Sequence, residues 1–344
     1  MWDERDNQVV RCKLCPNYCV LKPGEFGKCG ARKNEDGTLY SLVYGGLSAM
    51  TPDPIEKKPL FHFWPGSGAY SISSVGCTLH CKHCQNYHIS QTNGESVRHL
   101  HEATPKDVVK AAKKNSCKSI AYTYNEPLTF YEFILDCAKL AHSEGVLNVL
   151  VTNGYITIEA LKPLAPFIDA ANVDIKAITD KFYKEICGVP RVKPVLEATK
   201  YMKEHGVFIE CTNLIIPGFN DTPEEIKELS EWVLKELGPD SPLHFSRFHP
   251  MYELSHVPAT PVSTITKARE IALEVGLHYV YCGNIPGNEG ENTYCPNCRN
   301  KVIGRIGFSI NRWDINKKNQ CNNCDTAIDV VGEYTKSKSW RSFS

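Results

Sequence analysis

The sequence lacks several features that would place it in a common class of protein. It has no run of 18 apolar residues, and its first ten residues are polar and of mixed charge, which argues against a membrane span and a signal peptide. Charge of neither sign dominates, since 39 Lys and Arg balance 39 Asp and Glu, whereas a nucleic-acid-binding protein is expected to be basic. No Walker-type phosphate loop or Ser-His-Asp arrangement is present. We therefore expect no membrane attachment, and the charge balance does not favour a nucleic-acid partner.

Cysteine, in contrast, is abundant. Sixteen occur in 344 residues, and eleven of them gather in clusters in which most neighbours are separated by two or three residues. This spacing is typical of metal ligands rather than of disulfides, so we place the protein in the reducing cytoplasm. Core or loop filling is the default interpretation for the five isolated cysteines, Cys117, Cys137, Cys187, Cys211 and Cys282.

The order of apolar and polar segments predicts three regions and a tail. Residues 1–68 form a lobe rich in turns and cysteine, 69–284 alternate strand-like and helix-like segments, 285–334 form a module rich in Asn and Cys, and 335–344 form a polar tail of disordered type. Strands are expected at 69–75, 119–122, 146–152, 170–175, 207–215, 243–247 and 277–281. This alternation predicts an α/β fold with a full or partial (β/α) barrel, or alternatively a doubly wound open sheet. In both folds the active site lies at the C-terminal ends of the strands.

Three cysteines follow the first of these strands in a C-x3-C-x2-C pattern, Cys77, Cys81 and Cys84. On one loop this spacing directs three thiolates to three irons of a [4Fe–4S] cluster, whereas a cluster that only carries electrons normally has four thiolate ligands. The fourth iron would be open to a substrate or cofactor. The alternative is a structural zinc site with His80, His83 or His88 as its fourth ligand.

Polar residues stand at the ends of the following strands. Asn125 and Glu126 come after the second strand and could hold an ammonium group, although an ordinary turn before a helix uses the same residue types. Asp174 and Lys176 end the fourth strand, where they could bind the charged groups of a zwitterion. The alternative is a local salt bridge with Lys181 or Asp180. His249 follows the sixth strand and is either a contact to cofactor or substrate or a packed side chain.

These motifs together resemble those of the AmmeMemoRadiSam-system radical S-adenosylmethionine (SAM) proteins, which are similar to pyruvate formate-lyase activating enzymes. The resemblance covers nearly the whole chain and rests on the Cys77–Cys84 loop and on the segments 12–30, 124–127, 152–154, 173–176, 216–218, 247–250 and 292–298. It implies a partial (β/α)6 barrel and an oxygen-sensitive radical SAM oxidoreductase. A reduced [4Fe–4S] cluster would cleave SAM to methionine and a 5′-deoxyadenosyl radical, which takes a hydrogen atom from an unidentified substrate.

The resemblance also implies roles for the residues at the strand ends. Asn125 and Glu126 would lie near the amino group of SAM. In the activating enzymes, two segments hold the methionine carboxylate of SAM and a monovalent cation. This chain matches those segments at Thr152, Asp174 and Lys176.

Two positions and three partners complete what the resemblance implies. Val151 stands where the pattern of the activating enzymes has an aspartate, so the chain departs from them at the cation site. His83 stands where the superfamily usually has an aromatic residue beside the adenine, and an imidazole can also stack there. The implied partners are an electron donor such as ferredoxin or flavodoxin, and Memo-like and AMMECR1-like proteins.

Two more cysteine sets flank the predicted barrel. The C-terminal set has two C-x2-C pairs with 22 residues between them, the signature of a zinc ribbon, and we expect zinc, or iron in a rubredoxin-like tetrahedron, at Cys295, Cys298, Cys321 and Cys324. The N-terminal set fits either zinc or an auxiliary [4Fe–4S] cluster and consists of Cys12, Cys15, Cys19 and Cys29. Zinc is favoured there, because a small lobe rich in turns gains folding energy from a metal.

Three functions are compatible with this sequence. The first is a radical SAM enzyme that acts on a small molecule, a peptide or an RNA base, and the second is an activase that abstracts hydrogen from a glycine of a partner enzyme. The third is a metal-binding adaptor without catalysis. The complete C-x3-C-x2-C loop, together with polar residues at successive strand ends, favours an enzyme.

Overall fold

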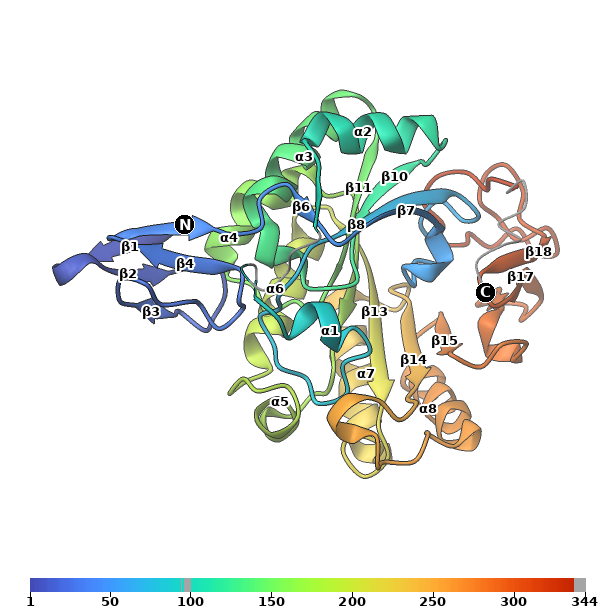
Figure 1. The fold of residues 1–344 in the computed structure, drawn as a ribbon. Helices are drawn as coiled ribbons and strands as arrows, with labels where there is room; N and C mark the ends of the chain where they lie inside the picture. Colours follow the sequence, from blue (N-terminus) through green and yellow to red (C-terminus); the bar gives the residue numbers. More distant parts are fainter. Residues whose placement is uncertain (94, 96–99, 337–344) are drawn as a thin grey trace.

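A computed structural model describes residues 1–93, 95 and 100–336, so the predicted polar tail lies outside the described residues from position 337 onward. One curved sheet of eight strands forms its centre (Figure 1). From one edge to the other the strands are β15 (Val280–Gly283), β14 (Leu243–Arg247), β13 (Phe208–Ile215), β12 (Ala170–Asp174), β11 (Leu147–Thr152), β10 (Ser119–Tyr122), β8 (Gly68–Ser73) and β7 (Ala49–Pro54). All neighbours are parallel except β7, which pairs antiparallel with β8.

The seven parallel strands follow one another in chain order across the sheet. A doubly wound sheet would reverse this order at a switch point, so that alternative was wrong and the winding is that of a barrel. In the part of the chain that the structure describes, β7 and β15 form two separate edges, and the barrel is therefore partial. This is the α/β architecture that the sequence predicted.

Six of the seven predicted strands agree with the structure to within two residues, whereas the last lies about three residues later than expected. The cause is Leu277, an apolar residue that belongs to the end of the preceding helix. Its N–H donates to the carbonyl of Ala272 and so terminates that helix. An apolar residue in the sequence does not show whether it belongs to the end of a helix or to the start of the next strand.

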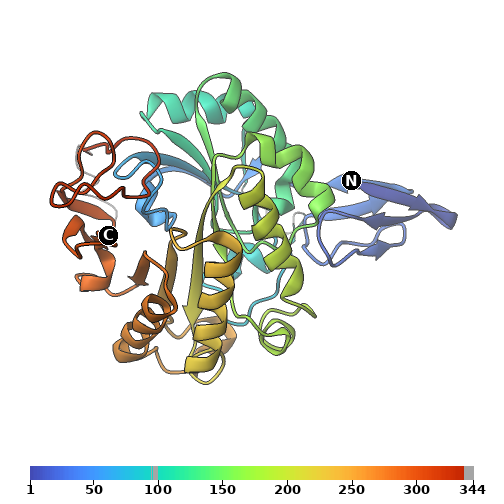
Figure 2. The same cartoon turned by 180° about the vertical axis from the view of Figure 1, so that it is seen from behind.

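Helices cover the convex face of the sheet (Figures 1 and 2). They are α2 (Pro105–Lys114), α3 (Tyr131–Ser143), α4 (Ile158–Leu164), α5 (Asp180–Glu185), α6 (Lys193–Glu204), α7 (Pro223–Leu237) and α8 (Val262–Val275), with the short α1 (Tyr87–Ser90) after the first parallel strand. Four begin after a threonine whose side chain accepts a backbone N–H of the first turn, namely Thr104, Thr157, Thr179 and Thr222. None of the described helices combines the length and hydropathy of a transmembrane span.

The two faces of the sheet bury different side chains. Ile120 and Tyr122 of β10 belong to the large core beneath the helices, whereas Ala121 between them belongs to a second cluster on the opposite face. Ile55 and Phe63, from the segment after β7, belong to this second cluster. The concave side of the barrel is thus filled near the start of the strands, which leaves the C-terminal strand ends for a site.

Two small lobes lie on opposite sides of the barrel (Figures 1 and 2). The N-terminal lobe contains β1 (Trp2–Arg5), β2 (Val9–Cys12), β3 (Val20–Leu21), β4 (Arg32–Glu35) and β5 (Thr38–Ser41), and β6 (Gly46–Leu47) pairs with β9 (His101–Glu102). The C-terminal module contains β16 (Thr293–Tyr294), β17 (Lys301–Ile306) and β18 (Ser309–Trp313). Arg305 joins this module to the barrel, because its buried guanidinium donates to Thr293 Oγ1 and to the carbonyl of Phe61, both at 2.8 Å.

Candidate active site

The three-cysteine loop leaves the C-terminal end of β8 and is fixed by the residue after the next strand. Asn125 accepts a hydrogen bond from the Ser74 N–H and donates to the Gly76 carbonyl, both at 3.1 Å. Farther along, the N–H groups of His80 and Lys82 donate to the backbone carbonyls of residues 187 and 186 at 2.9 Å. Asn125 therefore holds the base of the loop, and the segment after α5 holds its middle.

The loop thiols are desolvated and receive polar contacts. Asn153 Nδ2 lies 3.6 Å from Cys77 Sγ, and Ser90 Oγ lies 3.1 Å from Cys84 Sγ. Burial raises the pKa of both Cys77 and Cys84. Each thiol loses its proton when its sulfur atom binds a metal ion. Asn153 belongs to the predicted Thr152–Gly154 segment, but only the structure shows that its amide reaches a thiol.

Cys187 lies beside Cys81, although the sequence placed it only as a filler of core or loop. A side-chain hydrogen bond from Cys187, together with burial, raises the pKa of Cys81 far above its ordinary value. Cys187 is fully buried, and it belongs to the segment that pairs with the loop. Its spacing from the other cysteines carries no signal of this contact, since the proximity depends on how α5 packs on the loop.

Glu126 connects the ends of β10 and β11. One carboxylate oxygen accepts from Thr152 Oγ1 at 2.9 Å and the Leu128 N–H at 3.2 Å, and the other accepts from Thr152 Oγ1 at 3.1 Å and the Asn153 N–H at 2.9 Å. Burial raises its pKa to about 7. Because internal donors occupy both oxygens, Glu126 positions the strand ends in this structure.

Asp174 and Lys176 at the end of β12 form an ion pair with each other, with 2.9 Å between Nζ and Oδ2. Burial by itself lowers the pKa of Lys176, but Asp174, Cys81 and Cys187 raise it to well above its ordinary value. The lysine therefore carries its positive charge beside the cysteine loop. The sequence offered a local salt bridge to Lys181 or Asp180 as the alternative, whereas the structure pairs Asp174 and Lys176 with each other beside the cysteine loop.

The two predicted histidines lie in different surroundings. His83 is buried, its ring centroid lies 6.3 Å from that of Phe182, and its Nδ1 has no hydrogen-bond partner. Burial and the charge of Lys176 lower its pKa to about 3, so the imidazole is neutral. His249, after β14, is exposed. The structure thus brings His83, Glu126, Thr152, Asp174 and Lys176 to the same end of the barrel as the cysteine loop, whereas His249 points to solvent.

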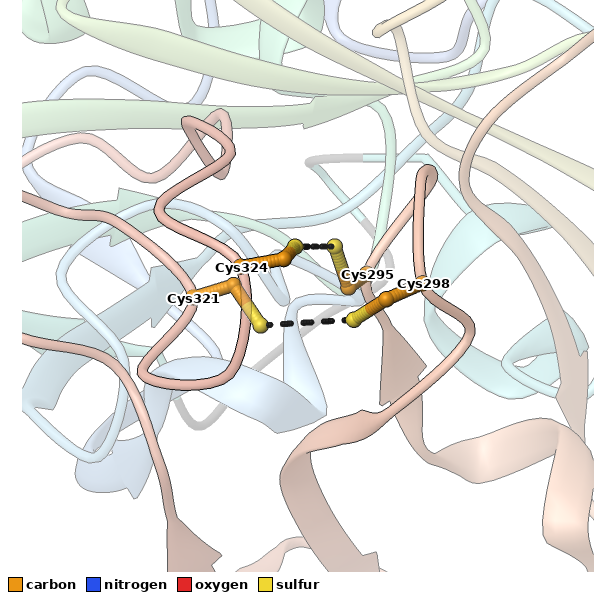
Figure 3. A group of neighbouring side chains, drawn as sticks. All are labelled: Cys295, Cys298, Cys321 and Cys324. Atoms are coloured by element: carbon orange, nitrogen blue, oxygen red, sulfur yellow. Dashed lines mark hydrogen bonds between the residues drawn. The ribbon is translucent and has the colours of Figure 1, made fainter.

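The C-terminal cysteines form a compact group in which two C-x2-C turns face each other (Figure 3). All four Sγ atoms lie within 4.8 Å of one another, and the distances are 3.5 Å for Cys295–Cys324 and 3.7 Å for Cys298–Cys321. Four thiolates around one tetrahedral zinc ion stand about 3.8 Å apart, since each Zn–S bond is about 2.3 Å. This geometry fits a single metal ion.

The other two cysteine sets are wider. Among the residues that the structure describes, the C-terminal group is the only one in which three or more potential ligand atoms lie within 4.8 Å of one another. The N-terminal cysteines nevertheless line one common hollow. His80, an alternative zinc ligand for the cysteine loop, is instead bonded through its ring to Gln91 and to the Lys28 carbonyl.

Comparisons with known proteins agree with this geometry. The model of the radical SAM superfamily matches residues 71–233, which include the cysteine loop and the strand ends from β10 to β13. An uncharacterised protein of Methanocaldococcus jannaschii is 46% identical over 332 residues, which cover 96% of this chain and 98% of that protein. The pyruvate formate-lyase-activating enzyme of Clostridium pasteurianum is 24% identical over 164 residues, 46% of this chain and 66% of that enzyme.

Among solved structures, a radical SAM methyltransferase from Sphaerobacter thermophilus is similar with a TM-score of 0.49 and 18% identity, over 67% of this chain and 71% of that one. The match to the superfamily model spans the loop and strand ends that the structure brings together. Residues 71–233 of the chain therefore form a radical SAM domain, and the chain is homologous to the pyruvate formate-lyase activating enzymes.

Proposed function

We propose that this chain is a radical SAM oxidoreductase in which Cys77, Cys81 and Cys84 ligate a [4Fe–4S] cluster and SAM binds at the fourth iron. The observation that carries the proposal is the position of a three-thiol loop at the C-terminal end of the first parallel strand, with a charged Lys176–Asp174 pair beside it. When bound, the cluster supplies the electron that cleaves SAM to methionine and a 5′-deoxyadenosyl radical.

The residues present fit these two groups. The three thiols lie too far apart to share one ion in the manner of the C-terminal group, as expected for ligands of separate irons. His83 has a buried Nδ1 without a partner among protein atoms, which a donor on a bound ligand would satisfy. Lys176 supplies a cation for a ligand carboxylate. We assign the adenine side to His83 and the methionine carboxylate side to Lys176 and Thr152.

The remaining residues act by position. Asn125 fixes the base of the cysteine loop, and Glu126 holds Thr152 and Asn153 in place beneath the ligand. Asn153 donates to Cys77 Sγ, a contact of the kind that tunes the potential of a bound cluster. His249 is exposed in this structure, so its predicted contact to SAM or substrate would require a ligand that reaches the loop after β14.

We also propose the narrower assignment to the AmmeMemoRadiSam-system proteins, with a ferredoxin- or flavodoxin-like electron donor and Memo-like and AMMECR1-like proteins as partners. A cytoplasmic location is part of this proposal, and the sixteen free cysteines support it. Zinc is proposed for the C-terminal tetracysteine site on the basis of its compact geometry.

The test is anaerobic reconstitution of the cluster, followed by addition of dithionite and SAM and detection of 5′-deoxyadenosine. Formation of the nucleoside is the expected result. Its absence from a protein with a fully assembled cluster would support the alternative of a metal-binding adaptor. Deuterium transfer into 5′-deoxyadenosine from labelled candidates then identifies the hydrogen donor.

A glycyl-radical activase is the second candidate, supported by the homology to a pyruvate formate-lyase-activating enzyme. Its substrate would be a glycine in a partner protein. Incubation of the reduced enzyme and SAM with a candidate partner should then give a glycyl-radical signal in electron paramagnetic resonance (EPR) spectra. Deuterium transfer from small molecules only would contradict the activase assignment.

A further inference from the structure

The four N-terminal cysteines share one hollow at the junction of the N-terminal lobe and the barrel. This hollow is lined by Cys12, Cys15, Cys19 and Cys29, together with Thr78 of the three-cysteine loop. The structure therefore directs four thiols from two turns of the lobe toward one volume. The buried apolar side chains of the lobe, such as Val10 and Leu21, belong to the same cluster as the barrel core and form no separate core of the lobe. The volume is therefore a candidate for a metal centre that would stabilise the lobe.

Backbone donors point at the four sulfur atoms. The N–H of Leu14 bonds to Cys12, that of Asn17 to Cys15 and that of Ala31 to Cys29, although burial has the larger effect and raises the pKa of all three thiols. The N–H of Lys28 lies 3.5 Å from Cys19 Sγ. N–H···S bonds of this kind stabilise metal-bound thiolates, so the loops are built for a ligand set rather than for four free thiols.

The spacing of these thiols distinguishes between the two metals that the sequence allows. Thiolates that share one zinc ion stand about 3.8 Å apart. The C-terminal group of this same chain meets that condition, whereas no three of the N-terminal thiols lie within 4.8 Å of one another in the described structure. A cubane cluster places each thiolate on a different iron and so requires a wider set. The zinc favoured by sequence alone is therefore the poorer fit.

A buried cation stands beside this volume. Arg32 lines the hollow, is 4% exposed, and makes two hydrogen bonds to Glu132 of α3, at 3.0 and 2.7 Å. A cluster with four thiolate ligands carries net negative charge, which this guanidinium partly balances.

The N-terminal set is in direct contact with the three-cysteine loop. The Cys29 carbonyl accepts a hydrogen bond from the Cys77 N–H at 3.2 Å, and Asn17 Nδ2 donates to the Thr78 carbonyl at 2.9 Å. Gly76 permits this approach, since its φ is +85° and a Cβ there would lie 2.1 Å from the Cys29 oxygen. One hydrogen bond thus joins the backbone of a ligand of each site.

We infer that Cys12, Cys15, Cys19 and Cys29 bind a second [4Fe–4S] cluster, which relays electrons to the cluster at Cys77, Cys81 and Cys84. A low-potential, one-electron protein donor reduces the N-terminal cluster from the 2+ to the 1+ state. That electron then passes to the loop cluster, and the N-terminal cluster returns to the 2+ state, with no bond made or broken and no proton moved. The relay rests on the proposed function, whereas the metal assignment does not.

Metal analysis of the full chain, purified without oxygen, tests the assignment directly. The expected content is roughly eight irons per chain in two [4Fe–4S] clusters, seen by Mössbauer spectroscopy, with zinc at the C-terminal group only. Cys15→Ser should remove half of the iron and leave the zinc content unchanged. Cys298→Ser should remove the zinc and leave the iron content unchanged. A second zinc ion that disappears in Cys15→Ser, with no loss of iron, would overturn the inference.

A pair of glycine variants tests the relay with both clusters in place. Gly76→Ala separates the two loops. Gly24→Ala is the matched control, because Gly24 lies in the N-terminal lobe, has a similar φ of +84°, and has no atom within 4 Å of an added Cβ. With ferredoxin as donor, freeze-quench EPR should show slower reduction of the loop cluster in Gly76→Ala only, at unchanged iron content. Equal reduction rates in both variants would refute the relay.

Failure of the relay and failure of the proposed function give different results. If the relay is wrong, Cys15→Ser still forms 5′-deoxyadenosine from SAM with ferredoxin at the wild-type rate. If the proposed function is wrong, no variant forms the nucleoside even with dithionite, while the count of irons at the N-terminal set still decides the metal assignment.

Discussion

Replacement of Lys176 by Met tests which side of the candidate site receives the carboxylate of SAM. Lys176 Nζ is 2.9 Å from Asp174 Oδ2, its side chain is only 15% exposed, and Asp174 keeps it charged. A hydrogen bond to a charged group contributes roughly 1.5–3 kcal/mol. At about 1.36 kcal/mol per factor of ten, its loss raises the Kd for SAM roughly 10- to 150-fold.

The assay is equilibrium binding of SAM to the anaerobically reconstituted enzyme, with cluster content verified by iron analysis. Lys181→Met is the matched control, because Lys181 is an exposed lysine on the neighbouring α5 and should leave the Kd unchanged. Unfolding of Lys176→Met should occur close to the wild-type midpoint, since Asp174 is 37% exposed and water can solvate it. Equal Kd values for the two lysine variants would refute the assignment of Lys176 to the carboxylate.

Four further substitutions should separate the roles of the cysteines and of a buried acid. Cys81→Ala should abolish formation of 5′-deoxyadenosine, whereas Cys298→Ala should chiefly lower stability in thermal unfolding; equal loss of chemistry at normal stability in both would contradict the assignment of the two metal sites. Cys187→Ser should retain four irons at the three-cysteine loop. In oxidised, cluster-free wild type we expect mass spectrometry to detect a disulfide between Cys187 and Cys81, which the variant cannot form. Loss of the cluster in the variant would instead make Cys187 a fourth ligand. Burial raises the pKa of Glu56 to about 7, above the ordinary value of 4.5, so the folded state holds an extra proton between these pH values and wild-type stability falls as pH rises. Glu56→Gln should remove about 2.5 kcal/mol of this decline between pH 5 and 8. Identical pH dependence of the unfolding free energy in urea for wild type and variant would contradict this expectation.

Much of the fold follows from local sequence because its signals are short-range. Strands such as β10 are buried on both faces and are therefore continuous apolar runs, and the threonine before α7 marks the start of that helix. The C-x2-C turns of the C-terminal module are equally local, since each turn fixes the direction of its own two thiols. For these elements the sequence pattern and the structure agree to within a few residues.

The candidate site was only partly predictable. The motif fixed the three thiols of the loop, and the order of the strands placed Asp174 and Lys176 near it. Nothing in the sequence indicated that Glu126 would turn inward to Thr152, or that His249 would face solvent at the end of β14. Side-chain direction on a loop depends on the neighbours that the loop meets, which are distant in sequence.

The amino-acid sequence by itself determined the alternation of strands and helices, the cysteine loop after the first parallel strand and the two flanking cysteine sets. Tertiary structure alone decided that the N-terminal lobe joins its Cys29 carbonyl to the Cys77 N–H, that Cys187 meets Cys81, and that the two flanking sets differ in spacing. The physical reason is that periodicity and capping act within a few residues of chain. Contacts between loops arise only when separate elements pack on one another.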